Sequence, residues 1–135
     1  MRRDKKERPE KPYLHDLPLF NKPAFETLSA YLDDTELLRD LIETFLQRAD
    51  ALLEQLDTTL NRGDAEAYRR LLHELLNEAQ VVRADALQHL CKIAEDQAAQ
   101  VFPSQAGERL VEVRRCVEDT QKVLKHWLRN TGLSS

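Results

Sequence analysis

Apolar residues recur at helical spacing along most of this chain. The longest run lies between residues 34 and 62, where the apolar positions alternate by four and three. That alternation is the 3.5-residue repeat of helices that pack in bundles. Its members are Leu38, Ile42 (with Leu41), Phe45, Ala49, Leu52, Leu56 and Leu60. This stretch therefore predicts one long amphipathic helix with a single buried face.

Three further stripes follow and predict three more helices. The first covers residues 64–82, and the second runs from residue 85 through Ala94. In the third, the polar residues Thr120 and Gln121 interrupt an apolar pattern that otherwise keeps helical spacing. Its apolar members are Leu110, Val113, Val117, Leu124 and Trp127. Because the links between these stretches are short, neighbouring helices are expected to run antiparallel.

Residues that start and stop helices separate the stripes. Asp34 or Thr35 is placed to cap the first long helix, and Gly63 suits the left-handed position that ends it. Asp64 is a strong N-cap for the second long helix, and Asp85 is positioned to cap the third. A break at residues 101–107, which contains Pro103, precedes the last helix, and Asn130-Thr131-Gly132 ends it.

The N-terminal part of the chain has a different character. Residues 1–20 mix basic and acidic side chains and are interpreted as a flexible tail or an interdomain linker. Asn21 and Pro23 then predict the start of a short amphipathic helix. Its apolar residues are Phe25, Leu28, Tyr31 and Leu32. The predicted fold is therefore all-α, an antiparallel four-helix bundle over residues 21–132 with an additional short N-terminal helix.

Composition and charge narrow the possible functions. A chain of 135 residues with 41% apolar and 33% charged residues fits one soluble helical domain. Its net charge of −4 gives no general attraction to nucleic acid or to an anionic membrane. No apolar run approaches the roughly 18 residues of a membrane helix, and the N-terminus lacks the apolar centre of a signal peptide. We therefore expect a cytoplasmic protein, and a monomer because one exposed patch does not require self-association.

The chain also lacks the patterns of several kinds of site. Cys91 and Cys116 fall among apolar helix positions and are expected to be core thiols rather than a disulfide. The histidines do not follow the spacing of a di-metal bundle or of a zinc helix, so no metal or other cofactor is expected. No glycine-rich phosphate loop is present, so the chain alone is not expected to act as a kinase.

His73 is the strongest candidate for chemistry. On a helical wheel it lies roughly 140° from Tyr68, the centre of the apolar stripe that runs through residues 64–82. Its neighbours on that polar face are Arg69, Arg70, Asn77 and Gln80. An imidazole in this position is open to solvent and to a partner, on a helix that the core holds rigid.

The residues around His73 resemble the histidine-containing phosphotransfer (HPt) domains of bacterial phosphorelays. The family pattern is a Gly-Asp helix start, a histidine nine residues after the Asp, and a Leu-x-x-Leu-Cys run on the next helix. Gly63-Asp64, His73 and Leu87-Gln-His-Leu90-Cys91 stand in that register. The resemblance extends over about residues 20 to 130 and implies the same helical bundle. His89 also has a lysine three residues on, Lys92, but its surroundings do not match the family pattern.

The resemblance implies that His73 accepts a phosphoryl group and shuttles it between aspartates of receiver domains. The partners would be receiver domains of response regulators or of a hybrid histidine kinase. The family has Lys, Gly and a later Gly where this chain has Leu76, Asn77 and Arg83. Arg69 and Arg70 lie on the same side of the helix and could replace the lysine's charge, against the effect of Glu74 and Glu78.

A second reading remains open. The chain could be a non-catalytic relative that keeps the bundle as a docking or sequestering surface for a receiver or another protein. Leu76, beside His73, suits a partly apolar contact patch in either case. Residue patterns leave open whether His73 is phosphorylated, which receiver binds, what the input signal is, and whether the chain comes from a larger sensor kinase.

Overall fold

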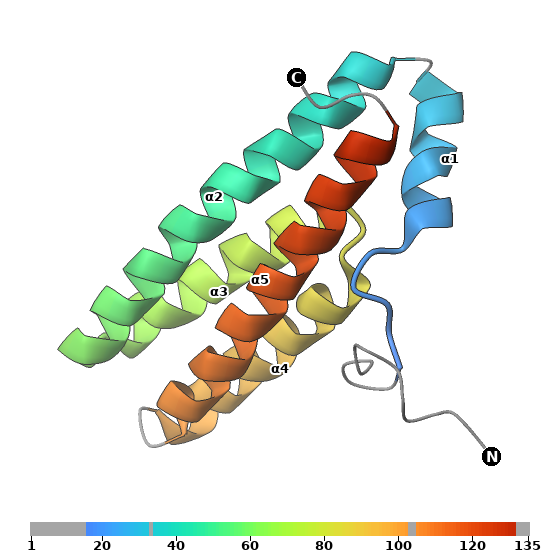
Figure 1. The fold of residues 1–135 in the computed structure, drawn as a ribbon. Helices are drawn as coiled ribbons and strands as arrows, with labels where there is room; N and C mark the ends of the chain where they lie inside the picture. The colour runs from blue at the N-terminus through green and yellow to red at the C-terminus, as the bar shows by residue number, and fades with distance from the viewer. Residues whose placement is uncertain (1–15, 33, 103–104, 132–135) are drawn as a thin grey trace.

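The computed structural model describes residues 16–32, 34–102 and 105–131. Residues 1–15, Pro103 and Gly132 lie outside these ranges. The regular elements of the described ranges are five α-helices (Figure 1). They are α1 (Lys22–Leu32), α2 (Thr35–Arg62), α3 (Ala65–Val81), α4 (Asp85–Val101) and α5 (Ala106–Asn130). The predicted all-α fold is confirmed.

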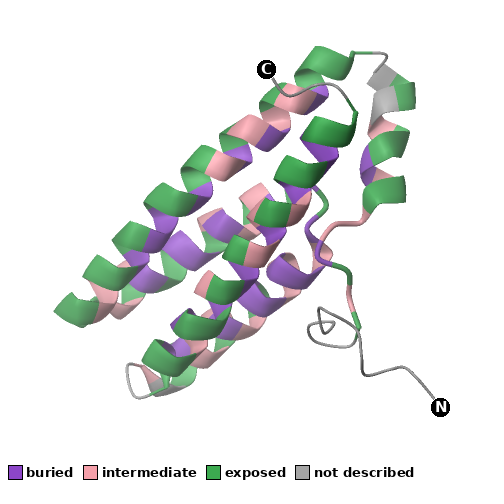
Figure 2. Cartoon of the chain, viewed as in Figure 1, coloured by how far each residue is buried: buried purple, intermediate pink, exposed green. Residues whose placement is uncertain are grey.

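The four long helices close into one bundle. Helix α2 packs against α3 and α5, and α4 packs against α3 and α5, with the most extensive contact between α3 and α4. Figure 1 shows these helices alongside one another, with α1 set at one end of the bundle. Their buried sides face inward (Figure 2), and the predicted stripes supply the core. The arrangement leaves the outer face of every helix to solvent.

The predicted boundary between α2 and α3 is confirmed in detail. Gly63 adopts the left-handed conformation (φ 71°), and its N–H donates to the carbonyl of Leu60. Asp64 then caps α3 by accepting a hydrogen bond of 3.1 Å from the N–H of Ala67. At the start of α2, Asp34 rather than Thr35 provides the cap. Such side-chain caps each stabilise a helix by about 1 kcal/mol, so they define where α3 begins.

The link between α3 and α4 differs from the prediction. Asp85 does not cap α4, because the N-cap position belongs to Ala84 and Asp85 is the first helical residue. The Asp85 carboxylate instead accepts a 2.8 Å hydrogen bond from the Asn21 side chain and lies 3.8 Å from the Arg83 guanidinium. Arg83 turns the chain with a positive φ of 61°, and α4 begins at Asp85, one residue earlier than predicted. Tertiary contacts with the N-terminal segment therefore replaced the local cap.

Two details of the predicted stripes are also wrong. Tyr31 was expected on the buried face of the short helix, but its side chain is 86% exposed. Thr120 was expected to loosen the last stripe, yet it is completely buried and donates a 2.7 Å hydrogen bond to the Cys116 carbonyl. A threonine can occupy a core position when its hydroxyl donates a hydrogen bond to a backbone carbonyl of its own helix. The break before α5 is also shorter than expected, since α4 extends to Val101 and α5 begins at Ala106.

The described part of the expected tail packs on the bundle. Leu19 is buried, and the carbonyl of Pro18 accepts a hydrogen bond from the N–H of Ala86. Phe20 forms an edge-to-face contact with Trp127 of α5, with ring centroids 6.2 Å apart. The packed part of the chain therefore begins before residue 21, and this segment holds the α3–α4 link in place.

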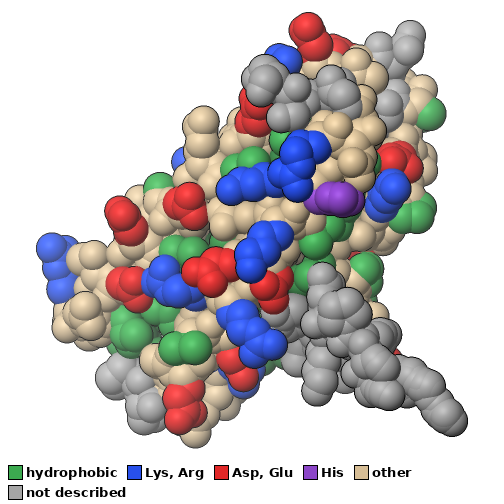
Figure 3. Space-filling model, viewed as in Figure 1, with side chains coloured by type: hydrophobic (Ala, Val, Ile, Leu, Met, Phe, Trp, Pro, Cys, Tyr) green, Lys and Arg blue, Asp and Glu red, His purple; other side chains and the backbone are tan. Residues whose placement is uncertain are grey.

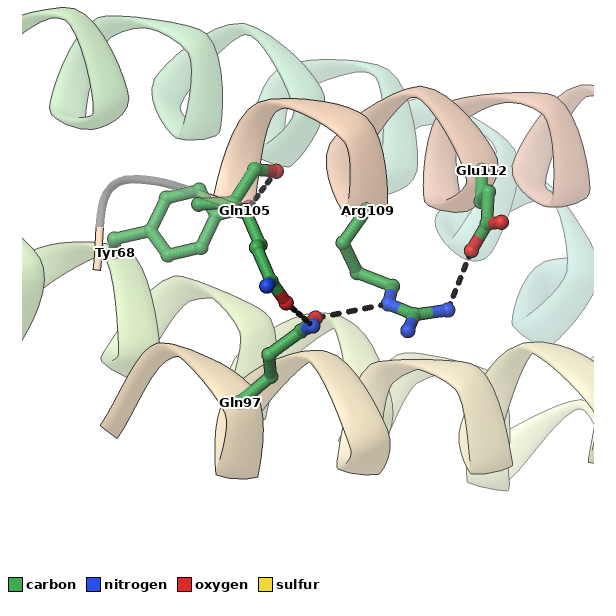
Figure 4. A network of polar contacts seen from close by, with 6 residues as sticks. Tyr68, Gln97, Gln105, Arg109 and Glu112 are labelled. Carbon is green, nitrogen blue, oxygen red and sulfur yellow. Dashed lines mark hydrogen bonds and ion pairs between the residues drawn. The ribbon is translucent and has the colours of Figure 1, made fainter. Parts of the chain in front are cut away.

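Polar side chains join α3, α4 and α5 at the opposite end of the bundle (Figure 4). Tyr68 donates from its hydroxyl to the carbonyl of Ala106, at 3.3 Å. Arg109 donates to Gln97 of α4 and to Glu112 of its own helix, and Gln97 donates to Gln105. Contacts at both ends of α3 therefore hold the helix in position against the bundle.

Candidate functional site

Helix α3 carries His73 on its exposed side, opposite a side that is buried in the core. The stripe predicted for this helix is buried along its length, with Tyr68, Leu72, Leu75 and Ala79 at 1% exposure or less. The His73 side chain, on the other side of the helix, is 58% exposed. Because the core fixes the rotation of α3, it also fixes the direction in which the imidazole points.

The imidazole borders a groove of about 590 Å³ between α3 and α4, called here the His73 groove. Helix α4 supplies one wall of the groove, the α3 side supplies the other, and the N-terminal segment reaches its edge through Leu17. The α3 side contributes His73, Leu76 and Arg83. The α4 side contributes Asp85, Gln88, His89, Lys92 and Glu95.

Glu95 is the direct partner of His73. Its carboxylate Oε1 lies 3.4 Å from the imidazole Nδ1, a long contact at the limit of hydrogen bonding. A carboxylate oxygen only accepts, so this hydrogen bond requires the hydrogen of the neutral ring to be on Nδ1. The lone pair of the neutral imidazole then lies on Nε2. The Glu95 side chain is only 18% exposed, which restricts its movement.

Two cations line the same groove, each with an acidic neighbour. Lys92 lies 3.3 Å from Asp96, one turn further along α4, and both side chains are largely exposed. Arg83 lies 3.8 Å from Asp85 at the far end of the groove. An exposed pair such as Lys92–Asp96 is weak and exchanges easily with other charged groups.

The structure places the six predicted site residues in two groups. His73 and Leu76 line the groove, and Leu76 is half-buried against the core. Arg69, Arg70, Asn77 and Gln80 are exposed on the same helix but do not line the groove. Glu74 and Glu78, expected to oppose the arginines, both pair with Arg48 of α2 instead.

Sequence reasoning missed the residues of α4. Positions 85, 88, 92 and 95 follow one another at intervals of three or four residues, and position 89 lies four residues after 85, so all five share one side of that helix. This spacing is visible in the sequence, and it includes the pair His89 and Lys92. What the sequence does not show is that this face turns toward His73.

A second hollow continues from the first. It has a volume of about 270 Å³ and lies between α1 and the end of α3, with Arg83 bordering both hollows. Its other lining residues include two exposed apolar side chains, Tyr31 and Val81. Exposed apolar area beside a reactive side chain is typical of a surface that binds another protein.

Other kinds of site find no support in the described residues. They contain no group of three or more His, Cys, Asp or Glu side chains that could hold a metal ion. None of the described helices is long and apolar enough to cross a membrane. On the face seen in Figure 3, acidic and basic side chains are interspersed, with no broad basic area of the kind that binds nucleic acid.

Comparisons with known proteins agree with the fold and with the sequence resemblance. The family described as "Hpt domain" matches residues 40–128. No curated protein matches the chain significantly. Among solved structures, the chain is similar to the histidine-containing phosphotransfer protein B (HptB) of Pseudomonas aeruginosa PAO1. The identity is 21% and the TM-score 0.76, over 84% of this chain and 96% of that one.

Proposed function

Since the chain belongs to the Hpt domain family, the phosphotransfer modules of phosphorelays, we propose that His73 is its phosphoryl acceptor. In this proposal the Nε2 atom receives a phosphoryl group from an aspartate of one receiver domain and passes it to another. The observation that carries the proposal is the exposed imidazole of His73 with its Nδ1 facing the Glu95 carboxylate.

The transfer step needs little from the protein beyond placement and charge. The Nε2 lone pair attacks the phosphorus of the partner's aspartyl phosphate, and an N–P bond forms. The P–O bond to the aspartate breaks, and its electron pair leaves with the carboxylate. The ring keeps its hydrogen on Nδ1 and becomes a phosphorylated imidazolium. Most enzymatic phosphoryl transfer depends on such positioning and electrostatic stabilisation.

Glu95 fits this step in two ways. As an acceptor for Nδ1–H it favours the tautomer that leaves Nε2 nucleophilic, as the buried aspartate does in a serine-protease triad. As an anion it stabilises the positive charge that develops on the ring. The same charge would favour release of the partner's carboxylate by stabilising the phosphorylated imidazolium product.

The partner proposed for this site is a receiver domain, whose aspartyl phosphate must reach His73. The His73 groove and the adjoining hollow give one continuous contact area, with Leu76, Val81 and Tyr31 as its apolar parts. These side chains provide the apolar contacts of the docking surface, and Arg83 lies between them. Helix α3 supports both the reactive residue and part of the docking area, so binding would place Nε2 directly.

The test is transfer of label from a receiver. Receiver domains from the source organism are phosphorylated with radiolabelled acetyl phosphate, mixed with the protein, and the protein is analysed for label that is lost in acid. We expect label on the wild type and none on His73→Gln. The variant His126→Gln, which changes an exposed histidine of α5, is the matched control and should be labelled normally. Equal labelling of His73→Gln would exclude His73 as the acceptor.

A docking-only module is the second candidate function. The observation in its favour is Leu76, which puts an apolar side chain rather than a cation beside His73 on α3. A docking-only protein would bind a receiver, measured by calorimetry, and would take no label from it. Binding together with labelling supports the phosphotransfer module instead.

A further inference from the structure

The contact between His73 and Glu95 shows the register of α3 against α4. The two helices are antiparallel, so a step forward along α3 corresponds to a step backward along α4. Leu76, three residues after His73, therefore lies opposite Lys92, three residues before Glu95. Both residues line the His73 groove, as this register requires. Lys92 is thus displaced from the level of Glu95 by roughly 4.5 Å along the helix axis.

Lys92 is the groove cation nearest to His73 along the bundle. The other groove cation, Arg83, lies beyond the end of α3, whose last residue, Val81, is eight residues or about 12 Å of helix past His73. The Lys92 side chain is largely exposed, and its pair with Asp96 is an i,i+4 contact at the surface. Such a contact leaves the ammonium able to turn toward a stronger anion.

We propose that Lys92 is a catalytic residue of this phosphotransfer site and supplies the cation for the phosphoryl group on His73. Its ammonium would leave Asp96 and bind the equatorial phosphoryl oxygens, while Glu95 on the same helix holds Nδ1. The inference rests on the proposed function of His73. It assigns the charge to α4 rather than to Arg69 or Arg70 of α3, which do not line the groove.

The half-buried side chain of Leu76 explains why the cation comes from across the groove. Leu76 packs against the core on the α3 side. The wall of the groove opposite Lys92 is therefore apolar. An apolar wall lowers the local polarity and strengthens the attraction between an ammonium and a phosphoryl oxygen. A lysine placed at position 76 would meet Lys92 and would be redundant with it.

The experiment measures the rate of label transfer at saturating labelled receiver, and receiver affinity separately. Lys92→Gln is expected to slow transfer on the order of tenfold, the effect of losing one charge-assisted contact in the transition state. Receiver affinity should fall by less than the transfer rate, because the ammonium acts mainly on the transferring group. Lys92→Arg should keep most of the rate. Adding Leu76→Lys to Lys92→Gln should restore transfer by returning a cation from the facing helix.

Matched controls identify the source of the charge. Lys122→Gln removes an exposed lysine from α5, and Arg70→Gln removes a cation one turn from His73 on α3. Both should transfer at the wild-type rate. The inference is overturned if Lys92→Gln transfers as fast as the wild type, or if Arg70→Gln alone slows transfer. A wild type that takes no label from any receiver refutes the proposed function and this inference together. A wild type that is labelled, with Lys92→Gln labelled at the same rate, refutes this inference alone.

Discussion

Replacement of Glu95 by glutamine tests the proposed chemistry at its central contact. Glutamine has the same length and keeps an acceptor oxygen, so it can still hold the hydrogen on Nδ1 of His73. What it removes is the negative charge that faces the ring as the N–P bond forms. The change in transfer rate therefore measures the charge and leaves the orientation of the ring intact.

The size of the effect follows from the 3.4 Å contact between the carboxylate and the ring. Coulomb's law gives roughly 1 kcal/mol at this distance in water and about 5 kcal/mol at an effective dielectric constant of 20. The imidazole is 58% exposed, so solvent screening keeps the effect near the lower value. A loss of about 1–2 kcal/mol corresponds to roughly five- to thirtyfold slower transfer.

The assay is rapid-quench label transfer from a saturating labelled receiver. Glu118→Gln is the matched control, since it removes an exposed carboxylate from α5 and should leave the rate unchanged. Glu95→Ala should be slower than Glu95→Gln because it also releases the ring. Transfer by Glu95→Gln at the wild-type rate, with unchanged receiver binding, would refute the electrostatic role of Glu95.

Three further predictions concern the core and the α3–α4 link. Burial raises the pKa of Cys116 to about 12 and that of Cys91 well above its usual value, so neither native thiol should react with a disulfide reagent at pH 8. Rapid modification without denaturant would contradict this. Burial, with a smaller effect of Cys91, raises the pKa of Tyr68 to about 12. The folded state therefore favours the neutral phenol, and stability present below pH 10 should decline by up to about 2–3 kcal/mol toward pH 12. Denaturant titrations should show this decline reduced in Tyr68→Phe, and an equal decline in both proteins would contradict the assignment. Arg83→Gly should be more stable than Arg83→Gln by about 0.5–1 kcal/mol, because glycine accepts the positive φ without strain. Thermal melts compare the two variants, which both lack the guanidinium, and equal melting temperatures would contradict the strain.

The sequence by itself determined the helices, most of their ends and the position of His73. Apolar periodicity depends only on how one helix turns its own residues, and a cap such as Asp64 acts within four residues. Both are local properties, so the boundary at Gly63 and the polar face carrying His73 could be predicted correctly. Cys91 and Cys116 were also predicted as free core thiols, because their spacing places them on the buried stripes.

Only the tertiary structure decided which residues meet His73. Glu95 lies twenty-two positions away, and its contact depends on the rotation and register of α4 against α3. That register is set by how the two apolar faces interlock in the core, which no pattern within a single helix records. The same holds for Asp85, which was predicted to be a cap and binds Asn21 instead, because a partner distant in sequence outcompetes a local role. Periodicity placed the imidazole on an outer face, and side-chain packing between α3 and α4 brought Glu95 against it and Lys92 into the same groove.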